Sequence, residues 1–148
     1  MTRHVLRQGR LDAGWTQEQL AARLGLTQEY VSLMERGRRP VPVRVARAAT
    51  RLLGLTPTSL TMPAPSMPRA TSEGWVARAV ARLEYPGLAY LRSSGAKRNP
   101  AEVLLRALAR DRLDPRLLES LPWLLLRFDG FDRDVLVNSA KLWNLQNR

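Results

Sequence analysis

Gln28, Glu29 and Ser32 bring an amide, a carboxylate and a hydroxyl together in one short stretch. Amides and carboxylates form hydrogen bonds with the edges of nucleic-acid bases, and each type prefers a different base. An α-helix that carries such groups at its leading edge fits the major groove of DNA. The chemistry therefore depends on whether the surrounding residues form a helix with these three side chains on its outer face.

The stretch from Leu26 to Gly37 predicts that helix. Thr27 is a suitable N-cap because its hydroxyl can accept a hydrogen bond from a backbone N–H of the first turn. Gly37 is a suitable C-cap beyond Arg36. Apolar residues recur at helical spacing and form its back, namely Tyr30, Val31, Leu33 and Met34. The three polar residues are left on the outer face.

A second helix is predicted immediately before this one. Thr16 caps it, Leu20, Ala21 and Leu24 form its apolar side, and Gly25 ends it. Only Leu26 separates that glycine from the next N-cap. Two helices joined by so short a turn, with glycine in it, form a helix-turn-helix.

The pattern from Thr16 to Gly37 reads T-Q-E-Q-L-A-x-x-L-G-L-T-Q-x-x-V-S-x-x-E-x-G, and it resembles the Xre-like, Cro/repressor-type DNA-binding domains. The resemblance covers about residues 3–60. It implies a five-helix domain over residues 1–60. The first helix is expected at 3–13, the fourth at 43–53, and a short fifth helix, capped by Thr56, at 56–60.

The resemblance also implies roles for single residues. Gln28 and Glu29 are the first candidates for reading bases, with Ser32 behind them and Leu33 placed to touch a thymine methyl group. The residues expected at phosphates are Gln17, Arg36, Arg38 and Arg39. Arg10 and Glu35 are expected to form a structural ion pair, because a bidentate arginine–carboxylate pair fixes two helices relative to each other.

Charge and composition limit the other functions. The net charge is +11, with +6 in residues 1–60 and +5 in the remainder, and this favours a polyanionic partner for both parts. Cysteine is absent and His4 is the only histidine. We therefore expect no metal site, no cofactor and no enzymatic activity. Because neither a long apolar run nor an apolar N-terminal segment is present, a cytoplasmic protein without a membrane partner is expected.

The rest of the chain predicts a second small helical domain. Residues 61–72 contain several prolines and are interpreted as a semi-rigid linker. Helical patterns follow at 73–83, from Pro100, from Pro115 and at about 133–146, with mostly loop over 84–98. Pro122 is expected to break or kink its helix. Trp143 and Leu145 look exposed in sequence, so the last helix either packs on its own bundle or meets a partner.

Two functions remain open for this all-α chain. The first is a sequence-specific transcriptional regulator, expected to be a repressor, that binds a pseudo-palindromic operator in double-stranded DNA as a homodimer. The second is an antitoxin, in which residues 73–148 bind a toxin protein and the N-terminal domain regulates its own operon. In either case residues 73–148 form a dimerisation or partner-binding domain.

Overall fold

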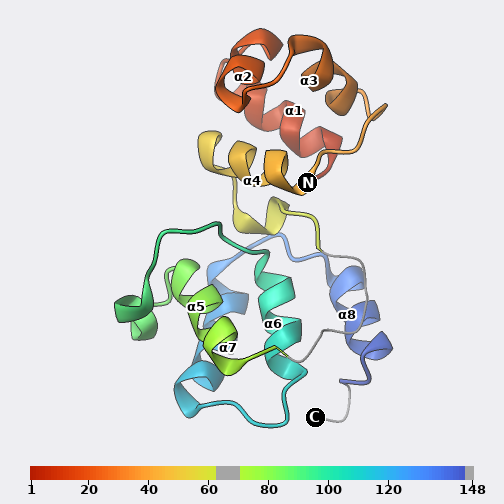
Figure 1. Cartoon of the computed structure of the whole chain (residues 1–148). Coiled ribbons are helices and arrows are strands. Elements are labelled where there is room, and N and C mark those ends of the chain that lie inside the picture. The colour runs from red at the N-terminus through yellow and green to blue at the C-terminus, as the bar shows by residue number, and fades with distance from the viewer. Residues whose placement is uncertain (63–70, 146–148) are drawn as a thin grey trace. The chain divides into compact units, whose positions relative to one another are not determined.

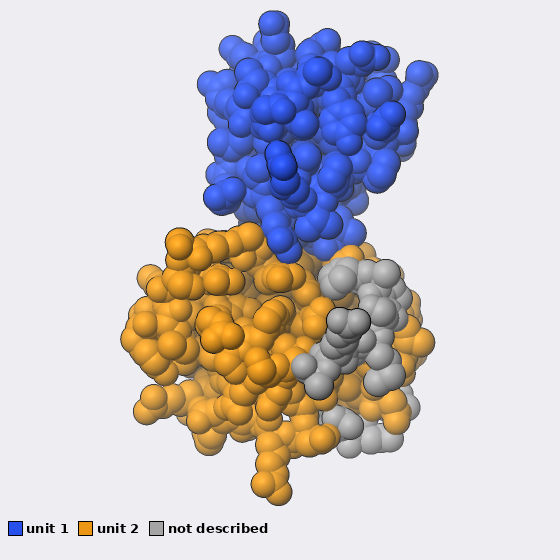
Figure 2. All heavy atoms as spheres, viewed as in Figure 1, with its two compact units in different colours: residues 1–61 blue, residues 62–148 orange. Residues whose placement is uncertain are grey.

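The computed structural model describes residues 1–62 and 71–145, and every regular element in these ranges is a helix (Figure 1). The chain divides into two compact units, Met1–Thr61 and Met62–Arg148 (Figure 2). Most of the predicted linker, residues 63–70, lies outside the described residues. None of the described helices is long and apolar enough to cross a membrane.

Unit 1 contains four α-helices and one short 3₁₀ helix: α1 (Arg3–Asp12), α2 (Gln17–Leu24), α3 (Gln28–Glu35), α4 (Val43–Leu52) and η1 (Pro57–Ser59). The predicted fifth helix is thus only a three-residue 3₁₀ helix. Thr56 does not cap it through a backbone N–H; its hydroxyl instead bonds the hydroxyl of Thr58 at 2.9 Å. Leu60 then returns to an extended conformation and is buried, so packing in the core ends the helix early.

The core of unit 1 is formed by apolar side chains from all four α-helices. Its fully enclosed members include Leu6, Leu20, Val31, Met34 and Ala49. Trp15 packs against the edge of this core, beneath the guanidinium of Arg23 at 4.2 Å from the ring centre. The core therefore holds α2 and α3 on α1 as one small bundle.

The turn between α2 and α3 is built by local hydrogen bonds. Gly25 has φ +65°, a left-handed conformation that glycine adopts without steric cost. Leu26 N–H then donates to the Ala21 carbonyl at 2.9 Å, and the Thr27 hydroxyl accepts from Tyr30 N–H at 3.2 Å. The predicted caps at Thr16 and Thr27 are confirmed, and α2 and α3 lie side by side (Figure 1).

Unit 2 is also helical, with α5 (Glu73–Arg82), the 3₁₀ helix η2 (Pro86–Leu91), α6 (Pro100–Leu108), α7 (Pro115–Arg127) and α8 (Arg133–Leu142). The residues that precede its last three helices, Asn99, Asp114 and Asp132, each cap the helix by accepting a hydrogen bond from a backbone N–H. Val76, Val80, Val103 and Leu124 are fully buried where α5, α6 and α7 pack together.

Of the two alternatives predicted for Pro122, a break or a kink, the break is wrong, because α7 continues from Pro115 to Arg127 with Pro122 inside it. A proline cannot donate to the carbonyl four residues earlier, which here belongs to Leu118. Both Pro122 and Leu118 are exposed, so water can satisfy that carbonyl. The buried side of α7 keeps its polar groups paired, since the Ser120 hydroxyl donates to the Leu117 carbonyl at 2.6 Å.

Trp143 and Leu145 are buried, which corrects their expected exposure. They pack against Leu105 of α6, with Met62 and Leu136 at the margin of the cluster. Of the two alternatives for the last helix, the structure therefore has it packed on its own bundle through these residues.

Candidate nucleic-acid interface

Arg10 of α1 and Glu35 at the end of α3 form a bidentate ion pair. The Nε of Arg10 donates to one carboxylate oxygen of Glu35 at 2.7 Å, and the Nη2 donates to the other at 3.0 Å. The Arg10 Nη1 donates to the Trp15 carbonyl at 2.7 Å, which ties the start of α2 to the same guanidinium. The two side chains are only 10% and 2% exposed. The pair therefore fixes the relative positions of three helices.

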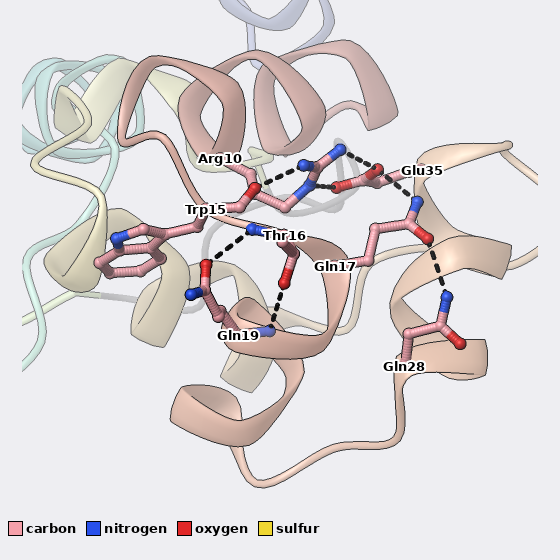
Figure 3. Close-up of polar contacts among 7 residues, drawn as sticks. All are labelled: Arg10, Trp15, Thr16, Gln17, Gln19, Gln28 and Glu35. Atoms are coloured by element: carbon pink, nitrogen blue, oxygen red, sulfur yellow. Dashed lines mark hydrogen bonds and ion pairs between the residues drawn. The ribbon is translucent and has the colours of Figure 1, made fainter.

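Gln17 extends this ion pair towards the surface. Its amide nitrogen donates to the Glu35 carboxylate at 2.9 Å, and its amide oxygen accepts from the Gln28 amide at 3.2 Å (Figure 3). A continuous chain thus runs from Arg10 through Glu35 and Gln17 to Gln28. Gln28 is exposed and keeps its own amide oxygen and one N–H available, which are the two groups needed to pair with adenine.

The environment of Glu35 keeps it ionised. Burial by itself would raise the pKa of this carboxyl, but hydrogen bonds from Arg10 and Gln17, together with the charges of Arg10 and Arg7, lower the pKa below its usual range. The hydrogen bond with Glu35 likewise raises the pKa of Arg10. The pair is therefore fully charged near neutral pH.

The prediction that Ser32 lies on the outer face of α3 is wrong, because Ser32 is only 7% exposed. Gln28, Ser32 and Glu35 follow each other at intervals of four and three residues, so they share one side of the helix. Gln17 contacts both the first and the last of them, which means that this side faces the start of α2. Ser32 lies between them and is covered.

Glu29 and Leu33 occupy another side of α3. Glu29 is exposed one residue beyond Gln28, in the first turn of the helix. Leu33 is half-buried, one turn further on. The exposed leading edge of α3 therefore offers Gln28 and Glu29, with Leu33 partly accessible behind them.

The three predicted phosphate-binding arginines follow α3 and are all exposed. The loop is tightened onto the helix end, since the backbone N–H groups of Arg38 and Arg39 both donate to the Leu33 carbonyl, at 2.9 and 3.2 Å. Gly37 has φ +74°, and a Cβ there would lie 2.7 Å from the Arg3 guanidinium. A compact glycine turn therefore holds these arginines against the C-terminal end of α3.

An open pocket of about 270 Å³ lies beside the ion pair, lined by Arg7, Arg10, Gln17, Glu35 and Arg36. Because Arg10 and Glu35 compensate each other, the exposed Arg7 and Arg36 leave the pocket positive, as a phosphate group would require. No role was predicted for Arg7 from the sequence. Its position one turn before Arg10 places it on the same side of α1, and this spacing could have indicated that it lies beside the ion pair.

Comparison with known proteins agrees with this geometry. Residues 3–61 match a family model described as a helix-turn-helix domain. No curated protein and no solved structure gives a significant match to the chain. Residues 3–61 of this chain therefore form a helix-turn-helix domain, as the resemblance to the Xre-like proteins implied.

Proposed function

We propose that this protein is a sequence-specific DNA-binding transcriptional regulator whose helix α3 enters the major groove. The observation that carries this proposal is the chain of hydrogen bonds from the buried Arg10–Glu35 pair through Gln17 to the exposed Gln28. A side chain that is held in place before binding loses less conformational entropy when it contacts a base. Glu29 lies beside it and adds a carboxylate that accepts from a cytosine amino group.

In this proposal, the side chains around the leading edge of α3 bind phosphates. Gln17, Arg36, Arg38 and Arg39 retain the roles expected from the resemblance, and the pocket adds Arg7. These contacts position the domain on the duplex without reading sequence. Ser32 is not among the base-reading residues of the proposal, because it is buried. The proposed activity is binding rather than catalysis.

A homodimer on a pseudo-palindromic operator is the proposed assembly, with repression as the expected effect. The exposed side of α7 supports an interaction role for unit 2. Leu118, Leu125 and Leu126 are 50%, 49% and 86% exposed and share one side of that helix with Pro122. An apolar side of this kind favours association with another protein surface. The same observation supports the antitoxin alternative, in which a toxin covers α7.

Selection of bound duplexes from a random pool by the purified chain tests the function. The expected result is enrichment of one motif repeated with two-fold symmetry, its half-sites about 34 Å apart. If duplexes are retained but no motif is enriched, the protein binds DNA without sequence preference, which would contradict the proposal of sequence-specific binding. Co-purification of the chain with the product of a neighbouring small gene, in a complex that still binds DNA, would favour the antitoxin alternative.

A further inference from the structure

The outer side of α4 carries three arginines. Arg44, Arg47 and Arg51 follow at intervals of three and four residues, so they form one stripe. The opposite side of the helix is the one that packs in the core, through Val45, Ala46, Ala49 and Thr50. With a rise of about 1.5 Å per residue the stripe is roughly 10 Å long.

These arginines have no acidic neighbours in the sequence. The sequence contains no aspartate or glutamate between Glu35 and Glu73. Among the described residues, the side chains of the three arginines take part in no hydrogen bond or ion pair. Arg44 and Arg51 are exposed and Arg47 is half-buried. The guanidinium groups are therefore available to a ligand.

The stripe is unfavourable in the free protein. Like charges one helical turn apart repel each other, and a cation in the first turn opposes the helix dipole. Arg44 occupies that first turn, which contains no acidic residue, and the N-cap residue Pro42 provides no side-chain hydrogen bond. A polyanion bound along α4 would remove this repulsion.

In the sequence, the stripe also follows a basic segment of the proposed interface. Arg36 is the C-cap of α3, Arg38 and Arg39 lie in the following loop, and α4 begins at Val43, so Arg44 is the second residue of the next helix. We propose that Arg44, Arg47 and Arg51 bind phosphates of the duplex beyond those next to α3, so that α4 extends the footprint along the DNA backbone. This inference rests on the proposed function, because it takes double-stranded DNA as the partner.

The experiment compares the full chain with a variant carrying Arg44→Gln, Arg47→Gln and Arg51→Gln. Binding to a mixed-sequence duplex is titrated over a series of salt concentrations. Each phosphate contact contributes about 0.9 to the slope of log K against log salt. We expect the slope of the variant to be smaller by roughly 2.7. The variant with three lysines in place of these arginines should keep the parental slope, because the charges remain.

A matched control removes the same charge from unit 2. Arg112, Arg116 and Arg133 are exposed there, and changing all three to glutamine should leave the slope within one contact of the parental value. An equal fall in this control would mean that net charge, and not the α4 stripe, sets the slope, and that result overturns the proposal. An unchanged slope in the α4 variant overturns it as well.

Further measurements distinguish a failure of this inference from a loss of folding and from a failure of the proposed function. The temperature of thermal unfolding should be no lower in the glutamine variant than in the parent, because repulsion between the arginines is relieved. If the triple variant fails to fold, Arg51→Gln alone gives the same test, with an expected slope change of about 0.9. If the parent binds no duplex at all, the proposed function fails and this inference with it. If the parent binds with an unchanged slope in the variants, only this inference fails.

Discussion

Gln28 shows how a surface side chain is positioned from the interior of a small domain. Its amide contacts Gln17, Gln17 contacts Glu35, and Glu35 is held by the buried guanidinium of Arg10. Each link uses a hydrogen bond of ordinary length, and the innermost pair is nearly inaccessible to water. The orientation of Gln28 is therefore coupled to the packing of α1, α2 and α3.

We predict that Gln28→Ala lowers affinity for the selected site by roughly 1–3 kcal/mol and changes affinity for other duplexes little, because it removes a base contact. Gln17→Ala should relax the same base preference, since it releases Gln28, and should also weaken general binding through its phosphate role. Selected-site profiles of the two variants and the parent provide the measurement. Profiles identical to that of the parent would show that Gln28 does not read a base and that Gln17 does not position it.

Glu29→Gln is expected to raise affinity for duplexes in general while relaxing the choice at one base pair by roughly 1–3 kcal/mol. The carboxylate is repelled by phosphates unless a cytosine amino group contacts it. Glu18 provides a matched control, because it is exposed and occupies the same position after the cap of α2 that Glu29 occupies in α3. Glu18→Gln should leave the preferred site unchanged, and an equal effect of both substitutions would argue for charge alone.

Glu35→Gln is expected to destabilise unit 1 by about 3 kcal/mol at neutral pH, because it leaves Arg10 buried without a countercharge. The folded-state pKa of Glu35 lies below the value of this carboxyl in the unfolded chain. The contribution of its charge is therefore complete above that value and is lost as the pH falls through the folded-state pKa. The difference from the parent should accordingly shrink in acid.

Hydrogen exchange of backbone amides in α1 and α3 measures this difference, because it reports the free energy of opening for unit 1 separately from unit 2. The control Glu18→Gln removes an exposed carboxylate and should change the opening free energy by less than about 1 kcal/mol. A difference between Glu35→Gln and the parent that stays constant from pH 7 down to pH 3 would contradict the assigned charge state.

At the level of elements, α3 and the following loop have separate roles in the proposed interface. The leading edge of α3 carries Gln28 and Glu29, whereas the loop presents Arg38 and Arg39. Two backbone hydrogen bonds to the Leu33 carbonyl fold the loop onto the helix, and the Arg39 guanidinium lies 5.6 Å from the centre of the Tyr30 ring. The side chains proposed to read bases and those proposed to contact phosphates are thus held in a constant position relative to each other.

Replacing Arg38 and Arg39 together by alanine should weaken binding to all duplexes about equally, since phosphate contacts carry no base information. The slope of log K against log salt should fall by about 2. Titrations over a salt series decide this, with Arg112→Ala plus Arg116→Ala as a control of equal charge. An unchanged slope would show that this loop does not touch DNA.

For the molecule as a whole, the two units contain separate cores and separate kinds of surface. Unit 1 presents arginines around the leading edge of α3, and unit 2 presents the apolar side of α7. A regulator of a symmetric operator needs both a reading surface and a self-association surface. Joining them in one chain raises the effective concentration of the second reading unit once the first is bound.

Leu118→Glu is expected to convert the proposed dimer into a monomer and to weaken operator binding, because it places a charge in an apolar contact. Leu11→Glu in α1 is the matched control, since Leu11 and Leu118 are 49% and 50% exposed. Light scattering of the two full-length variants provides the masses. If the Leu118 variant remains dimeric, α7 is not the surface that joins two copies.

The helix-turn-helix could be predicted from the sequence because the interactions that define it are local. Thr16 and Thr27 each accept from a backbone N–H three residues further on, and Gly25 supplies the left-handed conformation of the turn. Such contacts depend on residue type and spacing alone. The pairing of Arg10 with Glu35 came from the resemblance, since they are 25 residues apart and no local rule joins them.

Only the tertiary structure decided which of the polar residues are available. Ser32 looked exposed because periodicity treats α3 as an isolated helix, whereas the packing of α2 covers that side. Gln17 was expected only at a phosphate, yet its amide also joins Glu35 to Gln28. Arg7 lines the pocket because α1 and the end of α3 meet there. The sequence by itself thus determined the two helices and their turn through local backbone hydrogen bonds, and the side-chain environment followed from contacts between distant residues.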